Sequence, residues 1–184
     1  MIYVALLRGI NVGGKNQINM KNLKKCFEDA GMRKVTTYIN SGNVIFEDTD
    51  HTKGEITALL EKAIYEDFLL DIKVLIRSID DFELIVKALP DHWKNDNDMK
   101  CDVMFLWEEI DNETLINELR IKQDIETVMY VPGALVWSVD REYLTKSSLL
   151  KLAASAVYKK MTIRNVNTTR KLYEIMKEIV QGIA

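Results

Sequence analysis

The chain contains little cysteine, proline or histidine, and each shortage excludes a class of structure. Its 184 residues include two of each. Cys26 and Cys101 lie far apart and have no CxxC partner, so we expect no disulfide and no thiol redox motif. His51 and His92 stand apart from each other and from the cysteines, which argues against a zinc site or a Cys-His nucleophile. We therefore expect no metal and no cofactor, and two prolines leave no room for a proline-rich linker.

The sequence also lacks an apolar run long enough to cross a membrane. Residues 1–7 are apolar, but the run is short, has no basic start and ends at Arg8. We expect a buried strand there and not a signal peptide. No other run approaches the roughly eighteen residues of a membrane span. Together with the scarce cysteine, this predicts a cytoplasmic protein with no membrane partner.

Charge is distributed unevenly along the chain. Residues 1–40 carry seven Lys or Arg against two Asp or Glu, and residues 141–184 carry nine against three. Residues 41–140 carry nine against twenty-three, and the whole chain has a net charge of −3. A pI near 5.5 argues against a protein that coats nucleic acid nonspecifically. If the fold brings the basic ends together, they form a positive site for an anion.

Hydrophobic periodicity predicts the order β-α-β-β-α-β in the first part of the chain. We expect strands at residues 2–7, 35–40, 44–46 and 72–76, and helices over 19–30 and 56–64. Asn19 is the expected N-cap of the first helix, and Gly31 its stop. Ser41, Gly42 and Asn43 form the expected turn between the second and third strands. This order is that of the ferredoxin-like split unit.

The same order recurs roughly a hundred residues later, which indicates duplication. We expect strands at 101–107, 128–131, 134–139 and 161–164, and helices over 112–119 and 149–158. A final helix carries an apolar stripe from Leu172 to Ile183, and Asn167, Thr168 and Thr169 are its cap candidates. The predicted fold is α+β: a ferredoxin-like half over 1–78, a linking helix and acidic loop over 79–100, and a second half with the C-terminal helix over 101–184. Both sheets are expected to be antiparallel.

A cluster of Gly, Asn and basic residues spans Arg8 to Asn16, between a predicted strand and a predicted helix. Gly13 and Gly14 would let the backbone approach an oxyanion, with Arg8 and Lys15 adding positive charge. The spacing gives neither G-x-G-x-x-G nor the Walker motif, because Lys15 is followed by Asn16. The alternative is a glycine-rich connection made of tight turns.

A second cluster, from Arg164 to Lys171, precedes the last helix. The free N–H groups of a helix start bind anions, and Arg164 offers a planar fork for carboxylate or phosphate. A capped helix with surface arginines explains the same residues. Ser147 and Ser148 lie beside Lys146 and Lys151, so a Ser–Lys nucleophile is conceivable, although a helix cap beside a solvated lysine is the commoner arrangement.

These clusters resemble the signature of a bacterial family known as domain of unknown function number 1697. The resemblance covers residues 5–14, Met20 and Leu23, and residues 37–46, and it resumes at 147–149 and 162–168. It implies two ferredoxin-like halves and no particular activity. Two positions depart from the family pattern. Val166 stands where the family has Trp, and Ser148-Leu149 lacks the lysine of a Ser-Lys step.

The sequence leads to the hypothesis of a small anionic ligand, such as a phosphate ester or nucleotide, bound between the two basic ends. The expected ligand-binding residues are Arg8, Asn11, Gly13, Gly14, Lys15, Ser41, Asn43, Arg164, Asn165, Asn167 and Thr168. No convincing general base is present, so no catalytic residue is assigned. The alternatives are a nucleic-acid-binding module and a protein-interaction module without catalysis. Neither turnover nor oligomeric state follows from the sequence.

Overall fold

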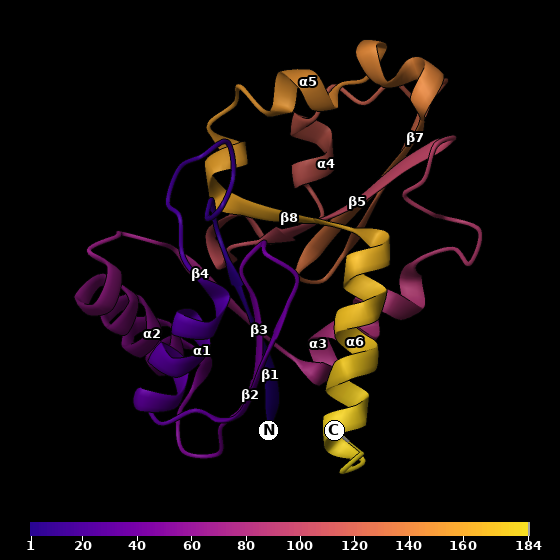
Figure 1. Ribbon diagram of the computed structural model, residues 1–184. Coiled ribbons are helices and arrows are strands. Elements are labelled where there is room, and N and C mark those ends of the chain that lie inside the picture. Colours follow the sequence, from indigo (N-terminus) through magenta and orange to yellow (C-terminus); the bar gives the residue numbers. More distant parts are fainter. Residues whose placement is uncertain (184) are drawn as a thin grey trace. The chain divides into compact units, whose positions relative to one another are not determined.

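The computed structural model describes residues 1–183, which divide into two compact units (Figure 1). One unit holds Met1–Asp80 and the chain from Leu172 on, and the other holds Asp81–Lys171. Each unit contains one four-stranded antiparallel sheet with helices, so the expected α+β fold of two tandem halves is confirmed. The finer domain boundaries stay a prediction. No helix within residues 1–183 is long and apolar enough to span a membrane.

The first unit has the ferredoxin-like arrangement that the sequence predicts. Its strands are β1 (Ile2–Leu7), β2 (Arg33–Tyr38), β3 (Asn43–Glu47) and β4 (Val74–Ser78), and its sheet order is β2-β3-β1-β4. The helices α1 (Met20–Asp29) and α2 (Lys53–Phe68) follow β1 and β3. Each strand pairs antiparallel with its neighbours.

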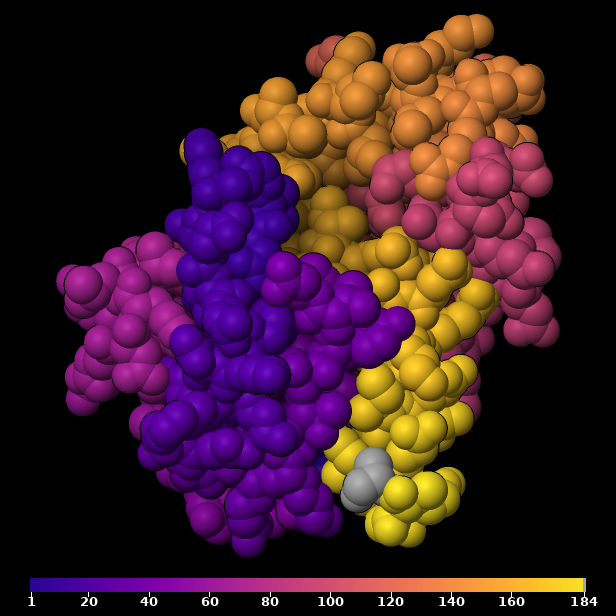
Figure 2. Space-filling view, in the orientation of Figure 1, coloured from indigo at the N-terminus to yellow at the C-terminus, as the bar shows by residue number. Residues whose placement is uncertain are grey.

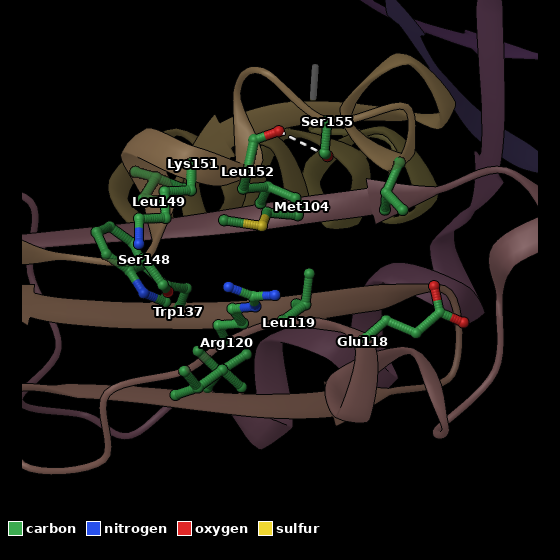
Figure 3. Close-up of a pocket in the computed structure, with 13 residues that line it drawn as sticks. Met104, Glu118, Leu119, Arg120, Trp137, Ser148, Leu149, Lys151, Leu152 and Ser155 are labelled. Carbon is green, nitrogen blue, oxygen red and sulfur yellow. Dashed lines mark hydrogen bonds between the residues drawn. The ribbon is translucent and has the colours of Figure 1, made fainter.

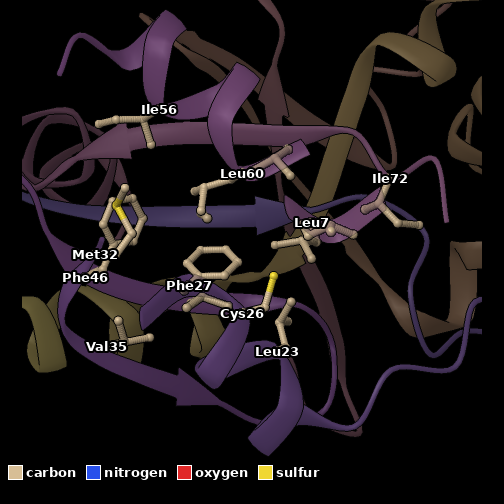
Figure 4. Packing of buried hydrophobic residues seen from close by; sticks show 14 of the residues in the cluster. Leu7, Leu23, Cys26, Phe27, Met32, Val35, Phe46, Ile56, Leu60 and Ile72 are labelled. Atoms are coloured by element: carbon tan, nitrogen blue, oxygen red, sulfur yellow. The ribbon is translucent and has the colours of Figure 1, made fainter. Parts of the chain in front are cut away.

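Local chemistry explains where these two helices begin and what they bury. The Asn19 side chain accepts hydrogen bonds from the N–H groups of Lys21 and Asn22, as expected for an N-cap. Thr52 and Glu55 form a capping box at the start of α2. The helices pack their apolar residues against one face of the sheet (Figure 4). At the centre, Phe27 of α1 meets Phe46 of β3 edge to face, with ring centroids 5.8 Å apart.

The second unit repeats the sheet but not the helices. Its strands are β5 (Met99–Leu106), β6 (Glu126–Val131), β7 (Ala134–Asp140) and β8 (Met161–Asn165), in the order β6-β7-β5-β8. Its helical segments are α3 (Ile79–Ala88, which begins in the first unit), α4 (Leu115–Glu118), α5 (Leu149–Leu152), and the 3-10 turns η1 (Glu108–Ile110), η2 (Arg141–Lys146) and η3 (Val157–Lys160). Phe82 of α3 stacks on Phe105 of β5.

Two expected helices are much shorter than the sequence pattern suggests. Residues 112–119 form only the four-residue α4, and residues 149–158 form only the four-residue α5 followed by η3. Ser155 contributes to the early end of α5, because its hydroxyl donates to the carbonyl of Leu152 at 2.7 Å. Serine side chains compete in this way with the helical hydrogen bonds.

The last helix, α6 (Val166–Val180), follows β8 without a loop, and its cap is not the one expected. The Asn165 side chain accepts from the N–H of Thr168 at 2.8 Å. The Thr169 hydroxyl donates to the Asn165 carbonyl at 3.0 Å. Thr168 and Thr169 therefore lie inside the first turn, and the predicted cap at residues 167–169 is wrong: asparagine caps through its short side-chain oxygen one turn earlier.

The two sheets share the same register, offset by 99 residues along β1 and β5. Leu7 N–H donates to Gly42 O at 2.9 Å, and Leu106 N–H donates to Gly133 O at 3.0 Å. Tyr3 pairs with Phe46, and Asp102 pairs with Trp137, so Trp137 holds the position of Phe46. This correspondence supports a duplication of one unit.

Candidate functional site

The glycines of the N-terminal cluster are explained by a tight turn. Val12 and Lys15 form an isolated antiparallel bridge, and Lys15 N–H donates to Val12 O at 3.0 Å. Gly13 and Gly14, the two residues between them, have φ of +58° and +76°. Two consecutive positive φ values are the requirement of a type I′ turn, which favours glycine at both positions. The loop lies on the surface (indigo in Figure 2), with Gly13, Gly14 and Lys15 exposed.

The asparagines of this cluster are bound to their own loops. The Asn11 amide oxygen accepts from Ile18 N–H at 2.8 Å, and its amide nitrogen donates to Ile18 O and to Asn40 Oδ1. Asn43 is fully buried, and its amide nitrogen donates to Ser41 Oγ at 2.9 Å. These bonds hold the 8–17 loop against the β2–β3 turn. The amides already have partners, which is what tight-turn scaffolding requires.

The C-terminal cluster is likewise tied to the protein. Arg164 is 8% exposed, and its guanidinium donates to Ile163 O at 2.8 Å and to Thr162 Oγ1 at 3.0 Å. Burial lowers the pKa of Arg164 to about 10, so the guanidinium is still charged at neutral pH. The Asn167 side chain bonds both backbone groups of Asn95, and Asn165 is the helix cap described above. Thr168 is buried.

The structure thus places the expected residues in two separate groups. Arg8, Asn11, Gly13, Gly14, Lys15, Ser41 and Asn43 belong to the first unit, and Arg164, Asn165, Asn167 and Thr168 belong to the second. Within the first unit, the Asn11–Asn40 bond of 3.1 Å brings the loop and the turn together. A ligand site shared by the two groups stays a prediction.

A cavity that the sequence did not indicate lies in the second unit. Its volume is about 300 Å³, and its lining is mostly apolar. It lies on the α4 and α5 side of the sheet (Figure 3) and is lined by Met104, Glu118, Leu119, Arg120, Ile121, Val128, Trp137, Ser148, Leu149, Lys151, Leu152, Ser155 and Val157. Ligand pockets in proteins begin at about this volume.

The cavity occupies space that full-length helices fill in the first unit. There, α1 and α2 are ten and sixteen residues long, whereas α4 and α5 have four residues each. Phe46 packs against Phe27 of α1, but its counterpart Trp137 borders the cavity. The shorter helices of the second unit therefore leave an apolar hollow where the first unit has a packed core.

Two cationic side chains border this apolar space. Arg120 and Lys151 both line the cavity, and neither side chain has a hydrogen-bond or ion-pair partner within residues 1–183. Figure 3 shows the Arg120 guanidinium directed toward Leu119 and Met104, whereas the carboxylate of Glu118 points away from them. Unpaired cations beside an apolar hollow can hold the charged end of an amphipathic anion.

A buried carboxylate lies behind the cavity wall. Glu126 is 5% exposed and accepts from Ser147 Oγ at 2.5 Å, from Trp137 Nε1 at 3.2 Å, and from the N–H groups of Lys122 and Ser148. Burial alone would raise the pKa of Glu126. The hydrogen bonds from Lys122, Ser147 and Ser148 outweigh burial, so the net pKa is lowered and the group is ionised at neutral pH.

Of the residues that line this cavity, the sequence pointed only to Ser148 and Lys151. Arg120 lay between predicted elements, and Trp137 lay within the predicted strand 134–139 with no role assigned. The cavity exists because α4 and α5 are short, and no sequence motif indicates a short helix. Among the described residues, no group of three or more His, Cys, Asp or Glu could hold a metal ion.

Comparisons with known proteins agree with the fold. The solved structure titled "The structure of conserved bacterial protein SP0830 from Streptococcus pneumoniae" is similar over 95% of this chain and 98% of its own, with 29% identity and a TM-score of 0.81. No curated protein matches the chain. The family described as "Protein of unknown function (DUF1697)" matches residues 1–137. These residues contain the four strands of the first sheet and extend into β7 of the second. The chain therefore belongs to the DUF1697 family.

Proposed function

We propose that this protein binds a small amphipathic organic anion in the cavity of its second unit. The observation that carries the proposal is the pair of unpaired cations, Arg120 and Lys151, on the lining of a mostly apolar hollow of about 300 Å³, whose one acidic lining residue, Glu118, points its carboxylate away from Arg120. The apolar part of the ligand would lie among Met104, Leu119 and Leu152. Its carboxylate, sulfonate or phosphate would lie toward the two cations.

The free energies of apolar burial and of ion pairing indicate different roles for the apolar and charged parts of the ligand. Burial of each methylene contributes about 0.8 kcal/mol, so a chain of several carbons supplies most of the affinity. Arg120 and Lys151 are exposed, and ion pairs at such positions are worth about 0–1 kcal/mol each. The cations therefore select the sign of the head group more than they add strength. This ligand is anionic, as the sequence suggested, but its body is apolar.

The shape of the site distinguishes this function from nucleic-acid binding. Single-stranded bases stack on aromatic platforms along a basic groove. The cavity has one aromatic ring, Trp137, and its other apolar side chains are aliphatic or methionine. A half-open, mostly aliphatic hollow suits the body of a small acid better than a row of bases.

Calorimetric titration with three eight-carbon probes tests the proposal. Octanoate carries a negative head group, octan-1-ol a neutral one and octylamine a positive one, on chains of equal length. We expect octanoate to bind at least tenfold more tightly than octylamine. Replacement of both cations, Arg120→Gln with Lys151→Gln, should remove this preference and leave binding of octan-1-ol within about twofold.

Lys94→Gln is the matched control, because Lys94 is an exposed lysine of the same unit that does not line the cavity. It should leave all three affinities unchanged. Equal affinity for octanoate and octylamine in the unmodified protein would refute the proposed selectivity. Tight binding of single-stranded RNA without binding of any eight-carbon probe would instead support the nucleic-acid alternative.

A further inference from the structure

Glu126 does not line the cavity, yet its carboxylate joins three parts of the cavity wall. The N–H of Lys122, which donates to Oε1 at 2.9 Å, follows the wall residues Arg120 and Ile121 directly. The indole N–H of Trp137 comes from β7. Ser147 and Ser148 donate from the start of α5 at 2.5 Å and 3.2 Å. No cation within residues 1–183 pairs with this carboxylate, so neutral donors hold its charge.

The α5 segment depends on these hydrogen bonds because so short a helix is not stable by itself. A helix of four residues has a cost of nucleation that its few internal hydrogen bonds do not repay. Among its residues only Leu152 is buried. The Ser147 hydroxyl donates to Glu126 and accepts from Leu149 N–H at 3.0 Å, so the same hydroxyl anchors the segment and pairs the N–H of its first helical residue.

We propose that Glu126 is a positioning residue that fixes residues 147–152 as one wall of the ligand cavity. This inference rests on the proposed function, because the affinity it controls is that for the amphipathic anion. The carboxylate holds Ser148, Leu149 and Lys151 beside Arg120 by bonds to the chain, not by contact with the ligand. Its removal frees the α5 segment, and the cavity loses one wall and one of its two cations.

Two substitutions and a matched control test the assignment. Glu126→Gln keeps the shape of the side chain but replaces one acceptor oxygen with an amide donor. In one amide orientation this donor faces the Lys122 N–H, and in the other it faces Ser147 Oγ–H and Trp137 Nε1–H, so at least one bond is lost either way. Ser147→Ala removes a single donor. Asp48→Asn is the control, since Asp48 is a buried carboxylate of the first unit that also accepts backbone N–H bonds, from Asp50 and His51.

The first readout needs no ligand. Hydrogen–deuterium exchange of the amides of residues 148–152 should accelerate at least tenfold in Glu126→Gln and stay unchanged in Asp48→Asn. Unchanged exchange in Glu126→Gln would overturn the positioning role, whatever the protein binds.

The second readout is calorimetric affinity for octanoate, in variants whose folding is confirmed by circular dichroism. We expect octanoate to bind at least tenfold more weakly to Glu126→Gln, several-fold more weakly to Ser147→Ala, and within twofold of the unmodified protein to Asp48→Asn. Equal weakening in Asp48→Asn would show a general stability effect and would refute the assignment. If the unmodified protein binds no octanoate, the proposed function fails, while the exchange result still decides whether Glu126 fixes the segment.

Discussion

At the scale of single residues, the arginine most suggestive of a ligand site is part of the interior. Arg164 was expected to bind an anion, but its side chain is buried on β8 and bound to Thr162 and Ile163. Arg77 holds the equivalent place on β4, because it pairs with Val4 as Arg164 pairs with Val103. Its guanidinium likewise donates to the carbonyl of the preceding residue, Ile76, at 3.1 Å. The sequence alone does not distinguish a buried structural arginine from one that binds a ligand.

Arg164→Ala should therefore destabilise the fold. The change leaves buried acceptors without a donor and opens a void, and losses of this kind amount to about 2 kcal/mol or more. Urea unfolding followed by circular dichroism measures the effect, with Lys94→Ala as the surface control, expected to stay within about 0.5 kcal/mol. A loss below that control range would contradict the buried role of Arg164.

Glu126 should make stability depend on pH in the acid range. Because hydrogen bonding lowers its pKa in the folded protein, the carboxylate stabilises the fold above its unfolded pKa of about 4.3. That contribution is lost as the pH falls through the lowered folded pKa. The difference in unfolding free energy between the unmodified protein and Glu126→Gln should be full at pH 7 and shrink below about pH 4. A difference that is constant between pH 7 and pH 3 would exclude this linkage.

At the scale of elements, strand positions follow from the sequence better than helix lengths do. The short apolar run of Ile2–Leu7 and the apolar segments at 128–131 and 134–139 predict strands that the structure contains. The apolar spacing at 112–119 and 149–158 predicts helices that are mostly absent. Periodicity reports which face could be buried, but not whether the neighbouring chain supplies enough contacts to extend a helix.

The β2–β3 turn packs closely against β1 and the loop that follows it, and Gly42 tests this packing. Gly42 has φ of +72°, and a Cβ there would lie 2.8 Å from Leu7 Cβ and 2.9 Å from Ile10 Cγ1. Gly42→Ala should cost about 2 kcal/mol from steric overlap and positive φ. Gly54→Ala, in the first turn of α2 with no atom within 4 Å of the new Cβ, should be neutral or stabilise by up to about 1 kcal/mol.

Thermal and urea unfolding of the two alanine variants measure the contrast. Equal stability changes for Gly42→Ala and Gly54→Ala would contradict the close approach of the turn to β1.

At the scale of the whole molecule, the protein contains two units with the same sheet order, one with a filled core and the other with a cavity. The shared register, with Trp137 in the place of Phe46, makes the comparison residue by residue. The duplication could be predicted from element order. The cavity could not, because it depends on the shortness of α4 and α5 and on where Arg120, from an irregular segment, directs its side chain.

The most direct measurement of the central claim is a titration of ¹⁵N-labelled protein with octanoate, followed by amide chemical shifts. The proposal predicts saturable shifts at residues 119–121, Trp137 and 148–152, including the Trp137 indole N–H, and none at residues 8–17. Shifts confined to residues 8–17 and 164–168 would contradict it and would return the anion site to the two basic ends of the chain.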